Sequence, residues 1–275
     1  MSISNFTTTR RIQLGLSLVE LMVAMALGLL LMTGVIQVFL SSRQTYAANE
    51  AMGRLQENGR FALEFIARSA RLAGYTEPVF EGGKPLALVR PSCTGLPGTI
   101  PAELCASTGS GNASDSVAFV FQPPFTDGVR RDCLGNTITE NNMLLINHYS
   151  IIPATATTPA SLGCRAYKFN DTTGSWTSGP AAQELISGVD SLQVLYGVNT
   201  SGDSRSANQY VSADRVTNWN NVRAVRIAVL ANSIAPLTPA PAGRNFVLLD
   251  AAPINFADNR ARQIFSTTIQ LKNTF

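Results

Sequence analysis

The chain is poor in the residues that most enzymes use for acid–base and metal chemistry. It has 275 residues, a single histidine, His148, and four cysteines, none of them in a Cys-x-x-Cys pair. Zinc sites take Cys and His ligands at closer spacing. The chain also lacks Gly-x-Ser-x-Gly, His-Glu-x-x-His and phosphate-loop patterns. His148 lies in an apolar segment, which favours a packed core histidine over a general base. We therefore expect no enzyme activity, no metal and no cofactor.

Charge is also scarce. Asp, Glu, Lys and Arg make up 14% of the residues, and the formal net charge is +3. Two of the basic residues, Arg10 and Arg11, lie close to the N-terminus, and beyond them the charges nearly balance. Binding to nucleic acids depends on clustered cations. No such cluster occurs, so we expect no nucleic-acid partner.

One long apolar run, Leu16–Leu40, follows this basic start, and its only ionisable side chain is Glu20. As a helix it would be roughly 37 Å long, enough to cross a bilayer. A cleaved secretory signal has a shorter apolar core, about 7–15 residues, and a lipoprotein signal needs a cysteine directly after the run, whereas the first is Cys93. The run therefore predicts a single membrane anchor. Arg10 and Arg11 predict a cytoplasmic N-terminus and an exported remainder.

Glu20 is the most informative residue of this run. A carboxylate at the centre of a membrane helix costs about 2.5–3.5 kcal/mol, and less near the helix end. An ionisable side chain retained at such a place indicates a function and a partner of opposite charge. The alternative is a carboxyl group that is protonated or reaches the lipid headgroups.

The four cysteines, Cys93, Cys105, Cys133 and Cys164, all lie beyond the predicted anchor. An exported position in an oxidising periplasm favours two disulfides, with free buried thiols as the alternative. Four cysteines allow three pairings. We favour Cys93–Cys105 with Cys133–Cys164, because neighbouring loops are the easiest to close.

Residues 41–74 continue the helical pattern beyond the apolar run, without a proline. Phe61 and Phe65 are expected to widen a buried stripe of small or apolar side chains spaced three and four residues apart. Gly74 is the expected C-terminal stop, so one helix over Leu16–Ala73 is predicted. The stripe consists of Ala48, Met52, Leu55, Gly59, Ala62, Ile66, Ser69 and Ala73.

The rest of the chain is rich in short β-strand patterns separated by polar loops. In the last of them, Phe265, Thr267, Ile269 and Leu271 share one face. The patterns predict an α+β fold in which an antiparallel sheet packs on the exported half of the long helix. The predicted strands are Leu86–Arg90, Ser116–Phe121, Met143–Tyr149, Arg165–Phe169, Val189–Val198, Val222–Ala231 and Ile264–Leu271.

Three segments resemble the type IV pilins. Gly15–Ala24 (GLSLVELMVA) resembles the processing site of type IV pilins and of type II secretion pseudopilins. Leu55–Ala62 (LQENGRFA) and Phe265–Asn273 (FSTTIQLKN) resemble the minor pilin family PilW. The first motif is specific, and the two shorter ones follow in the expected order.

The resemblance implies cleavage between Gly15 and Leu16 by a prepilin peptidase and N-methylation of Leu16, which stands where most relatives have Phe. Glu20 would then be the fifth residue of the mature chain and would pair with the terminal amine of a neighbouring subunit. An incidental small residue before a helix is the alternative for Gly15. The implied organisation is a leader at 1–15, a transmembrane half-helix at 16–40, an exported half-helix at 41–74 and a head at 75–275.

The implied function is that of a minor pilin in a complex that primes or caps the type IV pilus. The expected partners are the prepilin peptidase, other minor pilins, the major pilin, the inner-membrane assembly machinery and the membrane itself. The expected location is the inner membrane, with the head in the periplasm, and the pilus tip after assembly. The alternatives are a minor pseudopilin of a type II secretion system and a membrane-anchored periplasmic enzyme or binding protein.

Overall fold

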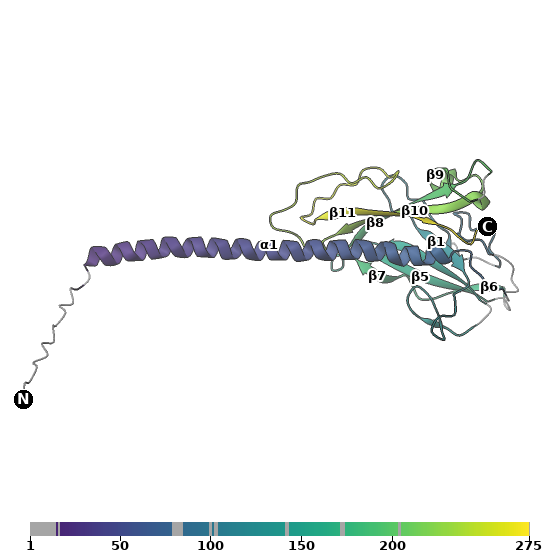
Figure 1. The fold of residues 1–275 in the computed structure, drawn as a ribbon, viewed down its shortest axis with the longest axis horizontal. Helices are drawn as coiled ribbons and strands as arrows, with labels where there is room; N and C mark the ends of the chain where they lie inside the picture. Colours follow the sequence, from purple (N-terminus) through teal and green to yellow (C-terminus); the bar gives the residue numbers. More distant parts are fainter. Residues whose placement is uncertain are drawn as a thin grey trace, which may run out of the picture. The chain divides into compact units, whose positions relative to one another are not determined.

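The structure is a computed structural model that describes Gly15 and residues 17–78, 85–98, 101, 104–140, 143–170, 174–202 and 205–274. It has one long helix, α1 (Leu18–Leu72), followed by β-strands (Figure 1). The chain divides into two compact units, Met1–Ala47 and Ala48–Phe275, with the boundary inside α1. The second unit contains the C-terminal part of α1 and all the strands, and it is called the head below.

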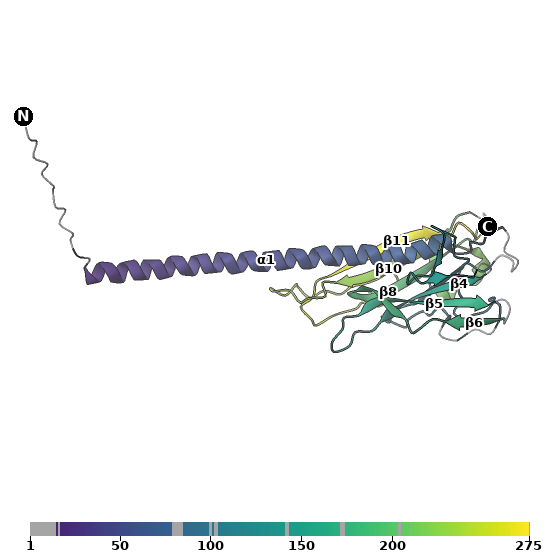
Figure 2. The same cartoon turned by 90° about the horizontal axis from the view of Figure 1, so that it is seen from below.

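Two antiparallel sheets form the head, as Figure 2 shows. The strands are β1 (Val117–Phe121), β2 (Arg130–Arg131), β3 (Thr137–Ile138), β4 (Leu144–Ile152), β5 (Ser161–Asn170), β6 (Ser175–Ser178), β7 (Gln183–Ser187), β8 (Val189–Val198), β9 (Gln209–Val211), β10 (Val222–Asn232) and β11 (Arg262–Gln270). The first sheet has the order β1-β4-β5-β6, with β7 also paired to β5, and the second has the order β11-β10-β8-β9. Strands β2 and β3 form a separate hairpin. Two short 3-10 helices, η2 (Ala213–Arg215) and η3 (Trp219–Asn221), lie between β9 and β10.

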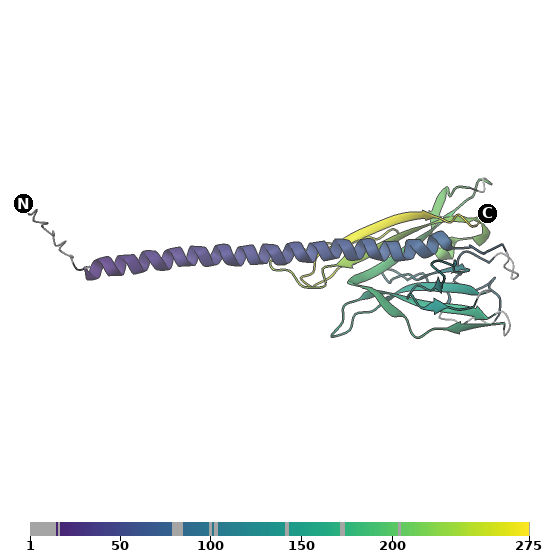
Figure 3. The same ribbon diagram turned by 60° about the horizontal axis from the view of Figure 1, so that its bottom comes forward.

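The C-terminal part of α1 lies beside both sheets (Figure 3). Its side chains Ala62, Ile66 and Ala70 are fully buried in one core with side chains from β1, β4, β8 and β10. Small residues on this face allow the helix to approach the strands closely. Asn58 also donates from Nδ2 to the Ser187 carbonyl at 3.0 Å. The α+β fold predicted from the sequence is confirmed.

The C-terminal end of the helix agrees with the prediction. α1 ends at Leu72, and Gly74 has a φ of +77°, the left-handed conformation that favours glycine after a helix. The Gly74 N–H donates to the Val120 carbonyl at 2.8 Å, so the stop is tied to β1. At the other end Leu16 lies outside the described residues.

Two expectations about apolar side chains are wrong. Phe61 and Phe65 do not widen the buried stripe, because 49% and 38% of their surfaces are exposed. Each precedes a buried residue, Ala62 or Ile66, by one position, which is about 100° around a helix. Met52 is likewise 36% exposed, whereas the stripe residues from Leu55 to Ala73 are buried as predicted.

The predicted strand Leu86–Arg90 is also wrong. It contains only one isolated bridge, from Leu88 to Phe119. Pro85 and Pro91 bracket it, and proline cannot donate to a ladder, so pairing with β1 stays short.

The cysteines form the two disulfides Cys93–Cys105 and Cys133–Cys164, with Cα–Cα distances of 5.1 and 6.5 Å. The first holds a loop over the face of the β1-β4-β5-β6 sheet that points away from α1, where Leu104 is fully buried in a second core cluster. The second ties the β2–β3 hairpin to β5. This is the pairing predicted from loop closure. Each bond restricts the conformations of a long loop.

Two buried titratable groups in the head have pKa values shifted in opposite directions. Burial, and then the nearby Arg165 charge, lowers the pKa of His148 to about 4. Burial raises the pKa of Asp115 to about 6, although the N–H groups of Gly109 and Val194 donate to its carboxylate at 2.7 and 2.8 Å. His148 therefore stabilises the fold above its unfolded pKa and loses that contribution as the pH falls to 4. Asp115 contributes at low pH and loses its contribution as the pH rises through 6.

These opposite signs predict different pH profiles for two variants. In Asp115→Asn, His148 is the member of the pair that still titrates, so acidification from pH 6.5 to 4 should lower the unfolding free energy, whereas in His148→Gln the protonation of Asp115 should raise it. The two changes should differ by roughly 5 kcal/mol, with about half of the difference from each group. Other carboxylates, such as Asp258, titrate alike in both variants. Chemical denaturation followed by fluorescence over this pH range measures the difference. Parallel profiles would contradict the assignment.

Candidate assembly site and its support in the head

The N-terminal motif lies at the start of α1. Gly15 is exposed, with no atom within 4 Å of the position that an added Cβ would take. The Ser17 carbonyl accepts the Leu21 N–H at 3.1 Å, so the helix is formed from its first turn. Leu16 and the predicted leader residues 1–14, with Arg10 and Arg11, lie outside the described residues. Gly15 therefore lies outside the helix and is not shielded by any described side chain.

Glu20 lies in the first turn of α1 and is exposed. The free N–H groups at a helix start carry partial positive charge, which stabilises a carboxylate there by about 0.3–1 kcal/mol. No ion pair joins Glu20 to a described residue. A full positive charge beside the Glu20 carboxyl group would therefore have to come from outside the described residues.

The apolar residues around Glu20 are uncovered. From Leu18 to Leu40 every side chain of α1 is exposed, and this stretch is long and apolar enough to cross a membrane. The hydroxyl of Thr33 donates back to the Leu29 carbonyl at 2.9 Å, so it needs no water. An apolar surface of this extent requires a lipid or protein environment.

In the head, the two PilW-like segments found in the sequence contact each other directly. Gly59 of α1 packs under the ring of Phe265 of β11, and a Cβ at Gly59 would overlap the ring carbons. Leu55, one turn earlier, is fully buried in a cluster that Phe265 also contacts. Small size at position 59 therefore decides how closely β11 approaches α1.

The end of the second segment caps α1. The side-chain amide of Asn273 donates toward the carbonyls of Arg71, Leu72 and Ala73 at 3.3, 3.5 and 3.2 Å. The last carbonyls of a helix have no partner within the helix, so this contact satisfies groups that would otherwise need water. Together, Phe265 and Asn273 fasten the last strand to α1 at two places.

The described part of the head has no evident metal centre. Within the described ranges, no three His, Cys, Asp or Glu side chains form a group that could hold a metal ion. Elsewhere in the head, Arg262 is buried between Asp190 and Asp258 at 2.7 and 2.5 Å. This cluster joins the loop before β11 to β8 and is structural, since both carboxylates are occupied.

Comparison with known families gives two matches. The prokaryotic N-terminal methylation motif matches residues 10–36, which include Gly15 and Glu20. Type IV pilus-assembly protein W, PilW, matches residues 148–273, from β4 to Asn273. Together the two matches support a type IV minor pilin that is similar to the PilW family. No curated protein and no solved structure matches it.

The family and the motif give the function in outline. The PilW match and the prepilin methylation motif support a type IV pilus-associated pilin that is anchored in the membrane by its apolar N-terminal helix. Both matches point to a structural protein, and they support contact with the pilus machinery and with a prepilin peptidase in general. The PilW match also contains Phe265 and Asn273, the residues that fasten β11 to α1.

The Gly59–Phe265 contact generates a prediction with a matched control. Gly59→Ala should destabilise the head by roughly 1–3 kcal/mol, because the added methyl group overlaps the Phe265 ring. Gly53→Ala lies on the same helix in open space and should stabilise by up to about 1 kcal/mol through helix propensity. Unfolding of the full chain in detergent, followed by near-UV circular dichroism, measures both.

The same unfolding measurement on Gly59→Ala in a Phe265→Ala background tests whether the ring is the cause. In that background Gly59→Ala should lose most of its cost, because the ring that it meets is gone. An equal cost in both backgrounds would show that the overlap is not the cause.

Proposed function

We propose that the chain is a minor pilin that takes part in type IV pilus assembly, within a complex of minor pilins that primes or caps the filament. It is a substrate of prepilin peptidase, which cuts between Gly15 and Leu16 and methylates the new amine. The observation that carries the proposal is Glu20: an exposed carboxylate in the first turn of an uncovered apolar helix, five residues after the exposed Gly15.

Cleavage supplies the missing counter-charge. Once the leader is removed, Leu16 carries a terminal amine, which is a cation whether or not it is methylated. A carboxylate and an ammonium group together are much less costly in a bilayer than either alone. A pair within one chain would hold no neighbour in place, so the pair that fixes a subunit's position joins two chains. Glu20 meets the amine of a neighbour offset along the helix axis.

The apolar half of α1 is covered by different surroundings before and during assembly. Before assembly, lipid covers Leu18–Leu40, with the N-terminus in the cytoplasm and the head in the periplasm. During assembly, the helices of other minor pilins and of the major pilin replace the lipid. Because lipid and helices are both apolar, exchanging one for the other does not fix how far a helix sits along its neighbours. The polar pair made by Glu20 sets that position.

The head is large for a repeating shaft subunit. It extends from residue 48 to 275 and has two sheets and two disulfides. A bulky head is tolerated at a filament end, where only one side contacts neighbours. We therefore place the protein at the pilus tip.

Processing is tested by substitution at Gly15. Gly15→Val should leave the chain unprocessed, because a branched side chain beside the scissile bond hinders a narrow peptidase cleft. Immunoblotting should show a product larger by the mass of the leader, and mass spectrometry should find the original N-terminus. Gly28→Ala, an exposed helical glycine in open space, is the control and should mature normally. Normal processing of the Gly15 variant would refute the cleavage site.

Assembly is tested at Glu20. Glu20→Gln and Glu20→Val should be processed normally yet reduce surface piliation by about tenfold or more, because the inter-chain charge pair is lost. Glu50→Gln is the matched control: it removes an acid from the same helix, where Glu50 only pairs with Arg54 at 2.8 Å on an exposed face. Wild-type piliation in both Glu20 variants would exclude the proposed pairing.

A further inference from the structure

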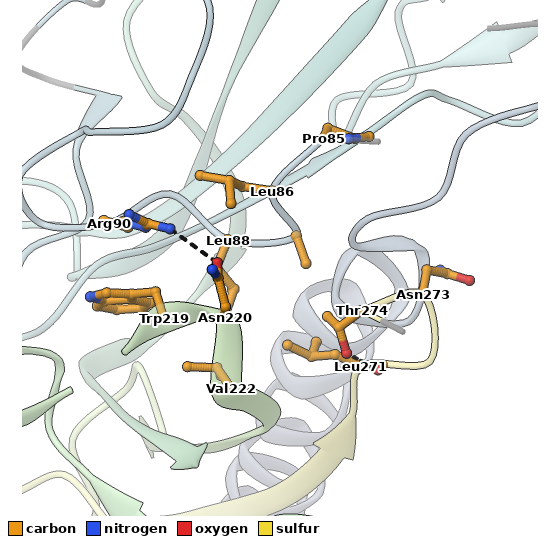
Figure 4. Close-up of a pocket in the computed structure, with 11 residues that line it drawn as sticks. Pro85, Leu86, Leu88, Arg90, Trp219, Asn220, Val222, Leu271, Asn273 and Thr274 are labelled. Carbon is orange, nitrogen blue, oxygen red and sulfur yellow. Dashed lines mark hydrogen bonds between the residues drawn. The ribbon is translucent and has the colours of Figure 1, made fainter. Parts of the chain in front are cut away.

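A small depression lies where the end of the chain meets the start of β10. It has a volume of about 200 Å³ and is formed by three separate segments: residues 85–90, the η3–β10 junction and residues 271–274. In Figure 4 Arg90 and Asn220 point toward each other beside Leu86, and Leu271 and Thr274 lie across from them. None of its lining residues is acidic.

Arg90 has no ion pair with any carboxylate among the described residues, unlike Arg130 and Arg262. Its Nη2 donates to Asn220 Oδ1 at a long 3.4 Å, and its buried Nε has no hydrogen-bond partner among the described residues. By contrast, Arg130 meets Glu77 at 2.8 Å and Arg262 meets Asp190 at 2.7 Å. Because no described carboxylate lies beside it, the Arg90 guanidinium leaves its positive charge and its terminal N–H groups for a ligand.

The walls of the depression are held in place before any ligand arrives. Trp219 packs edge-on against buried Tyr196, with ring centroids 4.9 Å apart. On the other side, Asn273 caps α1, and the Thr274 hydroxyl donates to the Leu271 carbonyl at 2.9 Å. Fixed walls reduce the entropy that binding must overcome.

We infer that this depression binds a carboxylate group, with the Arg90 guanidinium as its cation and the Trp219 and Leu86 side chains against the carbon atoms next to it. Arginine's planar fork suits a carboxylate because two N–H groups can donate in parallel. The volume is below the range of drug-sized sites and fits a single small acidic group. The group belongs either to an acidic peptide of another protein or to a free organic acid. The inference does not depend on the assembly role of Glu20.

The test is a fluorescence titration of the full chain in detergent micelles at pH 7 and constant ionic strength, with Trp219 as the reporter. The probes are glutarate, the peptide Ac-Ala-Glu-Ala-NH2, its neutral relative Ac-Ala-Gln-Ala-NH2, and inorganic phosphate. We expect saturable binding of the two carboxylates and none of the neutral peptide. If the acidic peptide binds more tightly than glutarate, the natural carboxylate belongs to another protein. If glutarate binds more tightly, it belongs to a free organic acid.

Variants decide whether Arg90 is responsible. Arg90→Gln should weaken carboxylate binding about tenfold or more, whereas Arg90→Lys should retain part of it. Arg54→Gln removes the same charge from an exposed helical ion pair and should leave binding unchanged. The midpoint of thermal unfolding, measured for each variant, distinguishes a lost ligand contact from a lost fold.

Four results would overturn the inference: no carboxylate binding, equal binding of the neutral peptide, equal binding of phosphate, or unchanged affinity in folded Arg90→Gln. A fifth concerns Glu81, an acid close in sequence that lies outside the described residues. If Glu81→Gln tightened glutarate binding about tenfold, the carboxylate for Arg90 would come from this chain itself.

Discussion

The fold depends on how a single apolar helix is covered. The head covers one half of α1, and it does so through small side chains that let both sheets approach. The other half, from Leu18 to Leu40, is exposed along its whole length. A helix divided in this way needs lipid or other helices around its first half. Glu20 is the one carboxylate on that half, so the group that pairs with it must be a cation.

Head and helix are joined at points far apart in the sequence. Phe265 on β11 lies over Gly59, and the side-chain amide of Asn273 caps α1 by donating to its last carbonyls. Both contacts fall near the two ends of the buried stripe. Both contacting residues, Phe265 and Asn273, fall within the PilW match.

Much of this arrangement could be predicted from the sequence. Spacing of small residues gave the buried stripe from Leu55 to Ala73, and the apolar run with Glu20 gave the anchor. Alternation along β11 placed Ile269 and Leu271 inward, as the structure has them. The disulfide pairing followed from loop closure. Each of these features depends on residues close together in the sequence, or on the length of the loop between two cysteines.

The rest depends on tertiary contacts that no local pattern carries. The short strands β2, β3, β6, β7 and β9 were not predicted, because strands of two to five residues are set by their neighbours. Phe61 appeared to belong to the core, yet the sheets cover only the face one position away. The depression at Arg90 joins three segments, so no motif in one of them indicates it.

The pairing of Glu20 with the terminal amine of another protomer can be captured by a zero-length carbodiimide cross-link on assembled pili, followed by mass spectrometry. If the two groups are in contact, the product joins the Glu20 carboxyl group to an N-terminal residue of a different pilin chain. A mature chain that begins beyond Ser41, or Glu20 peptides that never join a terminal amine in intact pili, would contradict it.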